Sequence, residues 1–297
     1  MAPSTAPNTS GPARSRRPGT PPHVMVLVME NRSYGEVVGS PSAPYETRLA
    51  RRFEVLTDYY GIGHYSLDNY LALVSGRFFP WATADCQPGP GCRASGPNLA
   101  SQLDAASIPW AAYMGGMAGD CREANSPGAL PAYGVRHDPF VYFPAVVRAD
   151  CAKIRPSSRL LADLDSSAPP DFVWYSPQIC HDGGGDEPCA TVAAGDRFLA
   201  RELPAIEATR WYRAGGVVVL TYDEGDSAGQ GLGEHLSGQG NHVPTLVISR
   251  ATEGAGALRS YVNHFGLLGS IEAAYGLACL AEACDASNGR VALVPRP

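Results

Sequence analysis

The chain has 297 residues, of which 44% are apolar and 18% are charged, and its formal net charge is −6 at pH 7. This length suffices for one sizeable α/β domain, and the negative charge argues against a nucleic-acid-binding protein that relies on a broad basic surface. Because the sequence contains no run of about 18 or more apolar residues, it predicts no transmembrane helix.

Residues 1–22 are rich in Pro, Ser, Thr, Gly and Arg and have no apolar core, so we expect a disordered N-terminal segment. This segment does not read as a signal peptide, because no apolar stretch follows the cluster of Arg14, Arg16 and Arg17. We expect one folded domain over residues 23–297.

Strand-like apolar runs alternate with helical patterns along this domain. The expected strands are His23–Met29, Asp171–Tyr175, Val217–Tyr222 and Thr245–Ser249. The expected helices are Leu67–Val74, Ala193–Glu207 and Phe265–Tyr275. This alternation is typical of a layered α/β fold with a mostly parallel sheet. Residues 77–170 hold many of the prolines and glycines, so we expect a loop-rich, lid-like insertion there.

Two of the expected strands end in polar oxygen donors. Glu30 and Asn31 follow the first strand, and Asp223 and Glu224 follow the third. Ligands bind at the carboxyl ends of parallel strands, where both pairs would meet. Solvent-exposed acidic residues are the alternative for either pair alone. Two matching strand ends favour a cation site, because clustered carboxylates repel one another without a cation and suit Mg²⁺, Ca²⁺ or Mn²⁺.

A glycine-rich turn, Gly61–Gly63, precedes a helical pattern that begins at Ser66 and ends at Gly76. Serine is a common N-cap, and from this segment alone a purely capping role is favoured. The amides and dipole of a helix N-terminus also favour an anion, and a nearby cation would lower the pKa of the hydroxyl. Ser66 is therefore also a candidate nucleophile.

Four of the seven histidines fall at the ends of expected strands or helices, where an imidazole could contact phosphate or protonate a leaving oxygen. They are His64, His137, His181 and His242. Each alone is more often a packed or surface residue. The absence of a Gly-x-Ser-x-Gly motif argues against an α/β-hydrolase, and no Walker A or dinucleotide-binding motif is present.

Eight cysteines include three pairs that are close in sequence, which favours local disulfides and an oxidising compartment. The pairs are Cys86–Cys92, Cys180–Cys189 and Cys279–Cys284, which leaves Cys121 and Cys151 as a fourth pair. Reduced thiols in a cytosolic protein are the alternative, and no CxxC spacing indicates structural zinc. We expect a secreted or extracytoplasmic protein, with a cytoplasmic location open because no signal peptide is present.

Five segments follow one another in the order seen in a known family: Met29–Tyr34, His64–Leu73, Arg136–Phe140, Thr221–Asp226 and His242–Pro244. From about residue 23 to its end the chain thus resembles the phosphoesterase family of non-specific phospholipase C enzymes and bacterial acid phosphatases, within the alkaline-phosphatase-like superfamily. The resemblance implies a three-layer α/β/α sandwich. It also implies hydrolysis of small phosphate esters through a phosphoserine, with a divalent cation such as Mg, Ca, Mn or Zn.

The same resemblance implies a role for each candidate residue. Ser66 would be the nucleophile, and His181 or His242 would protonate the leaving oxygen. The implied metal ligands are Glu30, Asn31, Asp223 and Glu224. The implied substrate-binding residues are His64, Asn69, His137 and Asp182.

The chain departs from its relatives at Gly35, where an Asp is usual, at Asp68, where a Pro is usual, and in the run Pro177–Gly184, which leaves the register of His181 open. The short chain favours an acid-phosphatase-like phosphomonoesterase. The alternatives are a phospholipase C-type phosphodiesterase acting on a lipid headgroup or metabolite, and an inactive relative that binds an anion or metal.

Overall fold

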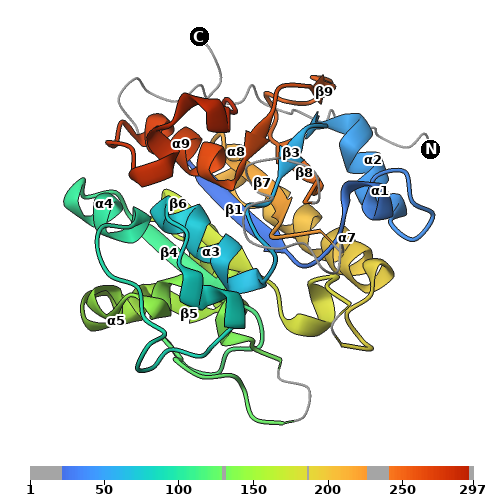
Figure 1. Cartoon of the computed structure of the whole chain (residues 1–297). Helices are drawn as coiled ribbons and strands as arrows, with labels where there is room; N and C mark the ends of the chain where they lie inside the picture. The colour runs from blue at the N-terminus through green and yellow to red at the C-terminus, as the bar shows by residue number, and fades with distance from the viewer. Residues whose placement is uncertain (1–21, 129–131, 186, 226–240, 294–297) are drawn as a thin grey trace, which may run out of the picture.

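The computed structural model describes residues 22–128, 132–185, 187–225 and 241–293. The expected disordered segment therefore lies, up to residue 21, outside the described residues. Within them, an eight-stranded sheet has the order β5-β4-β6-β1-β7-β8-β2-β9 (Figure 1). The strands are β1 Val24–Met29, β2 Glu54–Leu56, β4 Trp110–Met114, β5 Ile154–Pro156, β6 Phe172–Ser176, β7 Val217–Tyr222, β8 Thr245–Ile248 and β9 Ala257–Leu258.

The sheet is mostly parallel, as the sequence predicts. The strands from β5 to β7 all run in parallel, whereas β8 is antiparallel to both β7 and β2. A small second sheet pairs β3 (Tyr59–Tyr60) with β10 (Val262–Asn263). The four strands expected from the sequence are confirmed as β1, β6, β7 and β8, with ends that differ by one residue at most.

Helices cover both faces of the sheet. Adjacent residues of β6 show this, because neighbouring side chains of a strand point to opposite faces. The ring of Trp174 lies 6.0 Å from that of Tyr70 in α3, whereas Tyr175 lies 6.1 Å from Phe198 in α7. The helices are α1 Tyr34–Val37, α2 Pro44–Arg52, α3 Ser66–Ser75, α4 Leu99–Ala105, α5 Pro144–Asp150, α6 Leu160–Leu164, α7 Val192–Glu207, α8 Arg210–Arg213 and α9 His264–Tyr275. The fold is thus an α/β/α sandwich.

The three helices expected from the sequence are confirmed as α3, α7 and α9. In Figure 1, α3 and α9 lie close together, and they pack against each other. α3 is buried along its whole length and ends at Gly76, whose φ of 66° is in the left-handed region that favours glycine. The helix that begins at Ser66 is therefore fixed by packing on all sides.

The expectation of a lid over residues 77–170 is wrong in one respect, because this stretch contributes β4 and β5 to the central sheet. β4 pairs in parallel with β6, from Trp110↔Phe172 to Met114↔Ser176. Its sequence, Trp-Ala-Ala-Tyr-Met, has no β-branched residue, so it carries a weak strand signal. Most of the described prolines and glycines that suggested a lid lie in the connections around these strands, although Pro156 ends β5.

Three predicted disulfides are confirmed: Cys86–Cys92, Cys180–Cys189 and Cys279–Cys284. The fourth pairing is wrong for this structure, where Cys121 and Cys151 are free thiols. Burial and the neighbouring Cys151 raise the pKa of the Cys121 thiol, so the two sulfurs lie close together without a bond. No helix within the described ranges has the length and apolarity needed to span a membrane.

Candidate active site

The ends of β1 and β7 bring two carboxylates together. The two strands pair in register from Val24↔Val217 to Met29↔Tyr222, so Glu30 and Asp223 leave the sheet side by side. Both side chains are buried. Oδ1 of Asp223 accepts the backbone N–H groups of Asn31, at 2.8 Å, and Glu224, at 2.7 Å. Oδ2 of Asp223 and both carboxylate oxygens of Glu30 have no hydrogen-bond partner beyond the neighbouring side chains of this cluster.

A second group of side chains meets Glu30 from the other side. Nε2 of His137 lies 2.5 Å from Oε2 of Glu30, and a guanidinium nitrogen of Arg136 lies 3.6 Å from the same oxygen. Oδ2 of Asp182 lies 3.9 Å from Nδ1 of His137. Glu30, His137 and Asp182 are all buried, and their candidate ligand atoms lie within 4.8 Å of one another. The sequence placed His137 and Asp182 at the substrate, whereas their position also suits a metal ligand.

The two carboxylates at this centre have pKa values that are shifted in opposite directions. Burial opposes the charged form of Glu30, but His137, Asp223 and Arg136 together hold its pKa below the usual range. Burial and the adjacent carboxylate of Glu30 raise the pKa of Asp223 well above its usual range. Two buried carboxylates in contact can both ionise only beside a cation.

The donor set fits a divalent cation. Buried oxygens of Glu30 and Asp223 and the Nε2 atom of His137 have no hydrogen-bond partner outside their own cluster. Native proteins rarely leave buried polar atoms without partners, so a cluster of such atoms indicates an absent ligand or ion. Carboxylate oxygens with one imidazole nitrogen suit Mn²⁺ or Zn²⁺ as well as harder cations.

Ser66 is the first residue of α3 and is buried. The residue before it, Tyr65, has a φ of 150°, a conformation that is rare outside glycine and that clusters at functional sites. Oε2 of Glu224 holds this turn, because it accepts the backbone N–H of Tyr65 at 2.8 Å and lies 2.9 Å from Nδ1 of His64. One turn further along α3, Tyr70 stacks on His137. In sequence, Ser66 thus lies between Tyr65, which contacts Glu224, and Tyr70, which contacts His137.

Asn69 holds the glycine turn. Its Oδ1 accepts the N–H groups of Ile62 at 2.8 Å and Gly63 at 3.2 Å, and its Nδ2 donates to the carbonyl of Gly63 at 2.9 Å. A Cβ atom at position 63 would lie 2.5 Å from Oδ2 of Asp68, so a larger residue there would displace that side chain. The side chain of Asn69, expected at the substrate, is therefore occupied by the backbone of the turn.

His181 does not join the centre. Its ring stacks on Phe198 of α7, with centroids 5.2 Å apart, and its Nδ1 lies 2.9 Å from Nε2 of Gln178. α7 covers the face of the sheet opposite α3, so His181 points away from Ser66. The following residue, Asp182, turns to the centre, and its carbonyl accepts the N–H of Glu30 at 3.0 Å.

His242 lies in an aromatic row beside the site. Its ring stacks on Tyr34, with centroids 4.6 Å apart, and lies 5.2 Å from the ring of Tyr60. The Nε2 atom is buried and has no hydrogen-bond partner. Burial lowers the pKa of His242. The imidazole is therefore held in place with one nitrogen left to contact another group.

Sequence reasoning missed three polar residues near the centre. Arg136 was noticed only as part of a segment, although it immediately precedes His137 and is the cationic neighbour of Glu30. Asp68 is buried with both oxygens unpartnered, and burial, Glu224 and Asp85 raise its pKa to about 8. Asp85 accepts the N–H of Leu67. A buried acidic residue in the first turn of an apolar helix was the available signal for Asp68.

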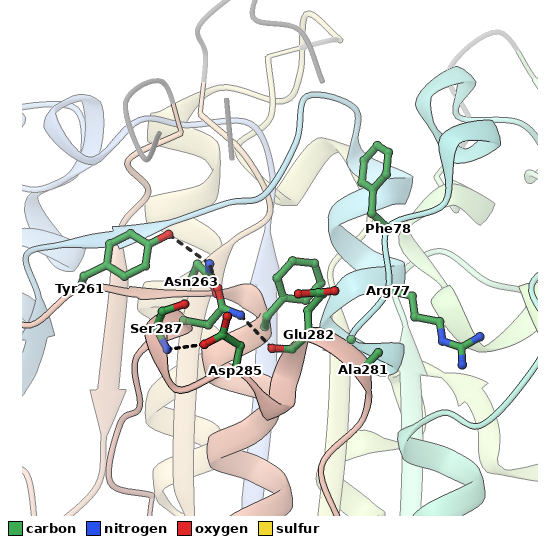
Figure 2. A pocket seen from close by; sticks show the side chains of 11 residues that line it. Arg77, Phe78, Tyr261, Asn263, Ala281, Glu282, Asp285 and Ser287 are labelled. Atoms are coloured by element: carbon green, nitrogen blue, oxygen red, sulfur yellow. Dashed lines mark hydrogen bonds between the residues drawn. The ribbon is translucent and has the colours of Figure 1, made fainter. Parts of the chain in front are cut away.

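A cavity of about 590 Å³ lies at the other end of α3 (Figure 2). Its polar groups bind one another: Nδ2 of Asn263 donates to Tyr261 at 3.1 Å and to Asn288 at 2.7 Å, and Asp285 accepts the N–H of Ser287 at 2.8 Å. The buried polar atoms without hydrogen-bond partners outside their own cluster lie around Glu30 instead. We therefore place the chemistry at the strand ends and not in this cavity.

Comparison with known sequences identifies relatives that are phosphatases. A sequence model of the phosphoesterase family matches residues 40–278. The phosphatidylinositol-3-phosphatase of Mycobacterium tuberculosis is 28% identical over 259 residues, which cover 86% of this chain and 77% of that protein. A probable acid phosphatase of Kluyveromyces lactis is 25% identical over 211 residues, covering 69% of this chain and 48% of the yeast protein. The phosphate-repressible acid phosphatase of Penicillium chrysogenum is 24% identical over 251 residues, covering 79% and 55%. The chain thus spans about half the length of the two fungal relatives.

Solved structures share the fold. A protein in the alkaline phosphatase superfamily from Vibrio parahaemolyticus aligns with a TM-score of 0.60 and 14% identity, covering 90% of this chain and 70% of that one. The lipoteichoic acid synthase LtaP from Listeria monocytogenes aligns with a TM-score of 0.60 and 11% identity, covering 90% and 76%. At these identities the likeness concerns the fold alone, and it agrees with the α/β/α sandwich described above.

Proposed function

This chain is a phosphoric ester hydrolase that belongs to the phosphoesterase family, and we propose that it is a metal-dependent phosphomonoesterase that acts through a phosphoserine at Ser66. One observation carries the proposal: the buried oxygens of Glu30 and Asp223 and the Nε2 atom of His137 crowd together with no hydrogen-bond partner outside their own cluster, near the helix that begins at Ser66. This arrangement suits a cation next to a nucleophile at a helix N-terminus.

Glu30, Asp223 and His137 would hold the cation, with Asp182 as a further ligand. When bound, it would neutralise phosphate oxygens and lower the pKa of the serine hydroxyl. Asn31 and Glu224 were also expected as ligands, and we keep them as candidates with less support, because both make other contacts. Asn31 binds Asp223 through its backbone N–H, and Oε2 of Glu224 is engaged by Tyr65 and His64.

The chain's own residues carry the proposed reaction. Ser66 Oγ would release its proton to solvent and attack phosphorus in line, and the bond from phosphorus to the leaving oxygen would break. The guanidinium of Arg136, held beside Glu30, would bind phosphoryl oxygens. His242 in its protonated form, which acidic pH favours because burial lowers the pKa of the ring, would donate a proton from Nε2 to the leaving oxygen. Water then hydrolyses the phosphoserine, which releases phosphate and restores the hydroxyl of Ser66.

The substrate and the compartment are proposed from the relatives and the disulfides. The name of the mycobacterial relative adds a lipid-borne monoester, a phosphoinositide, to the substrates worth testing. Three disulfides support an extracytoplasmic location. A panel that compares aryl phosphate, a phosphoinositide monoester and an aryl phosphodiester would separate phosphatase from phospholipase C-type activity.

The test of the nucleophile is Ser66→Ala against an aryl phosphate. We expect kcat/KM to fall by at least roughly 10³-fold, because no other hydroxyl can take over the covalent step. Ser75→Ala is a matched control, since Ser75 is a buried serine at the opposite end of the same helix, whose hydroxyl donates to the carbonyl of Leu71. Undiminished turnover by Ser66→Ala would contradict the assignment. Mass spectrometry of the acid-quenched enzyme should find a phosphoryl group on the peptide that contains Ser66.

A further inference from the structure

The start of α3 is held by carboxylates from distant parts of the chain. Its N-cap residue, Tyr65, makes no side-chain hydrogen bond to the helix. Glu224 accepts the N–H of Tyr65, and Oδ1 of Asp85 accepts the N–H of Leu67 at 2.9 Å. Helices are ordinarily capped by the Ser, Thr, Asp or Asn that directly precedes them. Here the amide that follows Ser66 is instead bound by a residue beyond the far end of α3.

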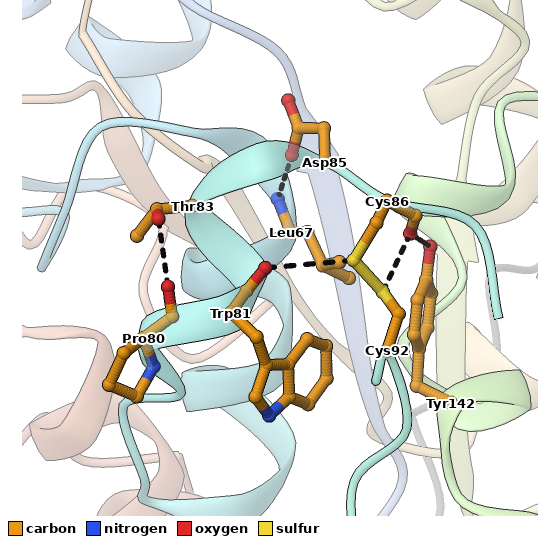
Figure 3. Close-up of a disulfide and its surroundings, with 8 residues drawn as sticks. All are labelled: Leu67, Pro80, Trp81, Thr83, Asp85, Cys86, Cys92 and Tyr142. Carbon is orange, nitrogen blue, oxygen red and sulfur yellow. Dashed lines mark hydrogen bonds between the residues drawn. A yellow bond between two sulfur atoms is a disulfide. The ribbon is translucent and has the colours of Figure 1, made fainter. Parts of the chain in front are cut away.

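Asp85 is itself held rigidly. It follows the 3₁₀ turn Pro80–Ala84, donates its N–H to the carbonyl of Ala82 at 3.0 Å and has a φ of 47°. The next residue, Cys86, forms the disulfide with Cys92 (Figure 3). The left-handed conformation and the covalent link both limit where the carboxylate of Asp85 can lie.

The same loop is bound to the segment that carries His137. The carbonyl of Cys86 accepts the hydroxyl of Tyr142 at 2.7 Å, as Figure 3 shows. Tyr142 ends the 3₁₀ turn Pro139–Tyr142, which begins two residues after His137. Burial raises the pKa of Asp85, while the N–H of Leu67 and the charge of Arg136 oppose the rise.

We propose that Asp85 is a positioning residue for the nucleophile: its carboxylate fixes the first turn of α3, and with it Ser66, relative to Arg136 and His137. The Cys86–Cys92 loop and Tyr142 act as the support that holds Asp85. This inference rests on the proposed function, in which Ser66 attacks phosphorus. Asp85 touches no reacting atom and acts only through the N–H of Leu67.

The test compares Asp85→Ala with Asp85→Asn. A small displacement of a nucleophile costs up to roughly 10²-fold in rate, so we expect Asp85→Ala to lower kcat by about 10- to 100-fold with KM changed by less than about 3-fold. Asp85→Asn keeps an oxygen that can accept the N–H of Leu67, so it should recover kcat to within about 5-fold of the wild type.

A matched control removes the side-chain cap of a different helix. Asn98 caps α4 by accepting the N–H of Ser101 at 3.1 Å. Asn98→Ala should lower Tm about as much as Asp85→Ala does, yet leave kcat unchanged. If Asp85→Ala also keeps full kcat, the carboxylate serves stability alone and the proposal is overturned. If Asp85→Asn is as slow as Asp85→Ala, positioning through the amide of Leu67 is overturned.

The disulfide provides a second measurement. The double variant Cys86→Ser/Cys92→Ser should lower kcat by roughly 3- to 10-fold, because it loosens the support of Asp85. The pair Cys279→Ser/Cys284→Ser removes a disulfide of similar span, with a sequence separation of 5 against 6, and should leave kcat unchanged. Equal kcat values for the two double variants would contradict the supporting role.

Ser66→Ala in the same assay separates this inference from the proposed function. Loss of activity in Ser66→Ala with full activity in Asp85→Ala overturns only the role of Asp85. Full activity in Ser66→Ala overturns the proposed function itself.

Discussion

Two groups of buried carboxylates meet at this site, and they differ in what they contact. At the strand ends, Glu30 and one oxygen of Asp223 have no hydrogen-bond partner outside the cluster that they form with His137. At the start of α3, Glu224 and Asp85 accept backbone N–H groups. Burial alone therefore does not identify a carboxylate as a metal ligand. Carboxylates without partners suit a cation, whereas carboxylates bound to amides hold the chain in place.

The largest effect should come from the strand ends. Glu30→Gln removes a charge that the proposed cation needs, so we expect kcat/KM to fall by roughly 10³-fold or more. Elemental analysis should find that the variant has lost most of its bound metal. Full metal content in the variant would show that Glu30 is not a ligand.

Glu224→Gln tests the other side of the comparison. The Gln oxygen can still accept the N–H of Tyr65, but the charge beside His64 is lost. We expect kcat to fall by about 10- to 100-fold while the metal content stays at the wild-type level. A loss of metal as large as that of Glu30→Gln would erase the distinction between the two groups and restore Glu224 as a ligand, as the sequence predicts.

His181→Ala should have a much smaller effect on activity. The ring stacks on Phe198 on the opposite face of the sheet from α3, so we expect kcat/KM to change by less than about 3-fold. His242→Ala, measured alongside, should lower kcat by about 10²-fold, because His242 is the proposed proton donor. The reverse order of effects would reassign the leaving-group proton to His181.

Glu46, outside both groups, should affect stability and not activity. Burial raises its pKa to about 8 from 4.5, although Tyr222 donates a hydrogen bond to it. Between these values the folded state holds a proton that the unfolded state has lost, so the free energy of unfolding decreases as pH rises. Glu46→Gln lacks this dependence. We therefore expect the free energy of unfolding of the variant, minus that of the wild type, to increase by about 1 kcal/mol per pH unit between roughly pH 5 and 8. Denaturant titrations at several pH values would measure this difference. A difference independent of pH would show that Glu46 is charged when folded.

The sequence predicted the features that depend on neighbouring residues in the chain. The apolar runs that end at Glu30 and Asp223 and the helix that begins at Ser66 have short-range signals, and the structure has all three elements. The layered α/β fold follows from the same alternation of strands and helices, whereas the three-layer arrangement was implied by the resemblance to the phosphoesterase family. Three disulfides were predicted because each closes a short loop.

What the sequence did not predict depends on long-range packing. His137 reaches Glu30 because α3 carries Tyr70 against its ring, and no local pattern encodes that contact. His181 and Asp182 are adjacent, yet a 3₁₀ turn at Ile179–His181 sends their side chains in different directions. β4 was missed because its two alanines and its methionine favour helix, which offsets the strand preference of its Trp and Tyr.

The register of β1 and β7 also limits how this protein can evolve. Their pairing, residue by residue from Val24↔Val217 to Met29↔Tyr222, fixes the separation of Glu30 and Asp223 through the backbone. Deleting one residue within β1 would draw Glu30 back by about 3.3 Å and turn it to the other face of the sheet. The surface connections can change length without altering that separation. Insertions and deletions among homologues should therefore be excluded from these two strands and accumulate in the connections.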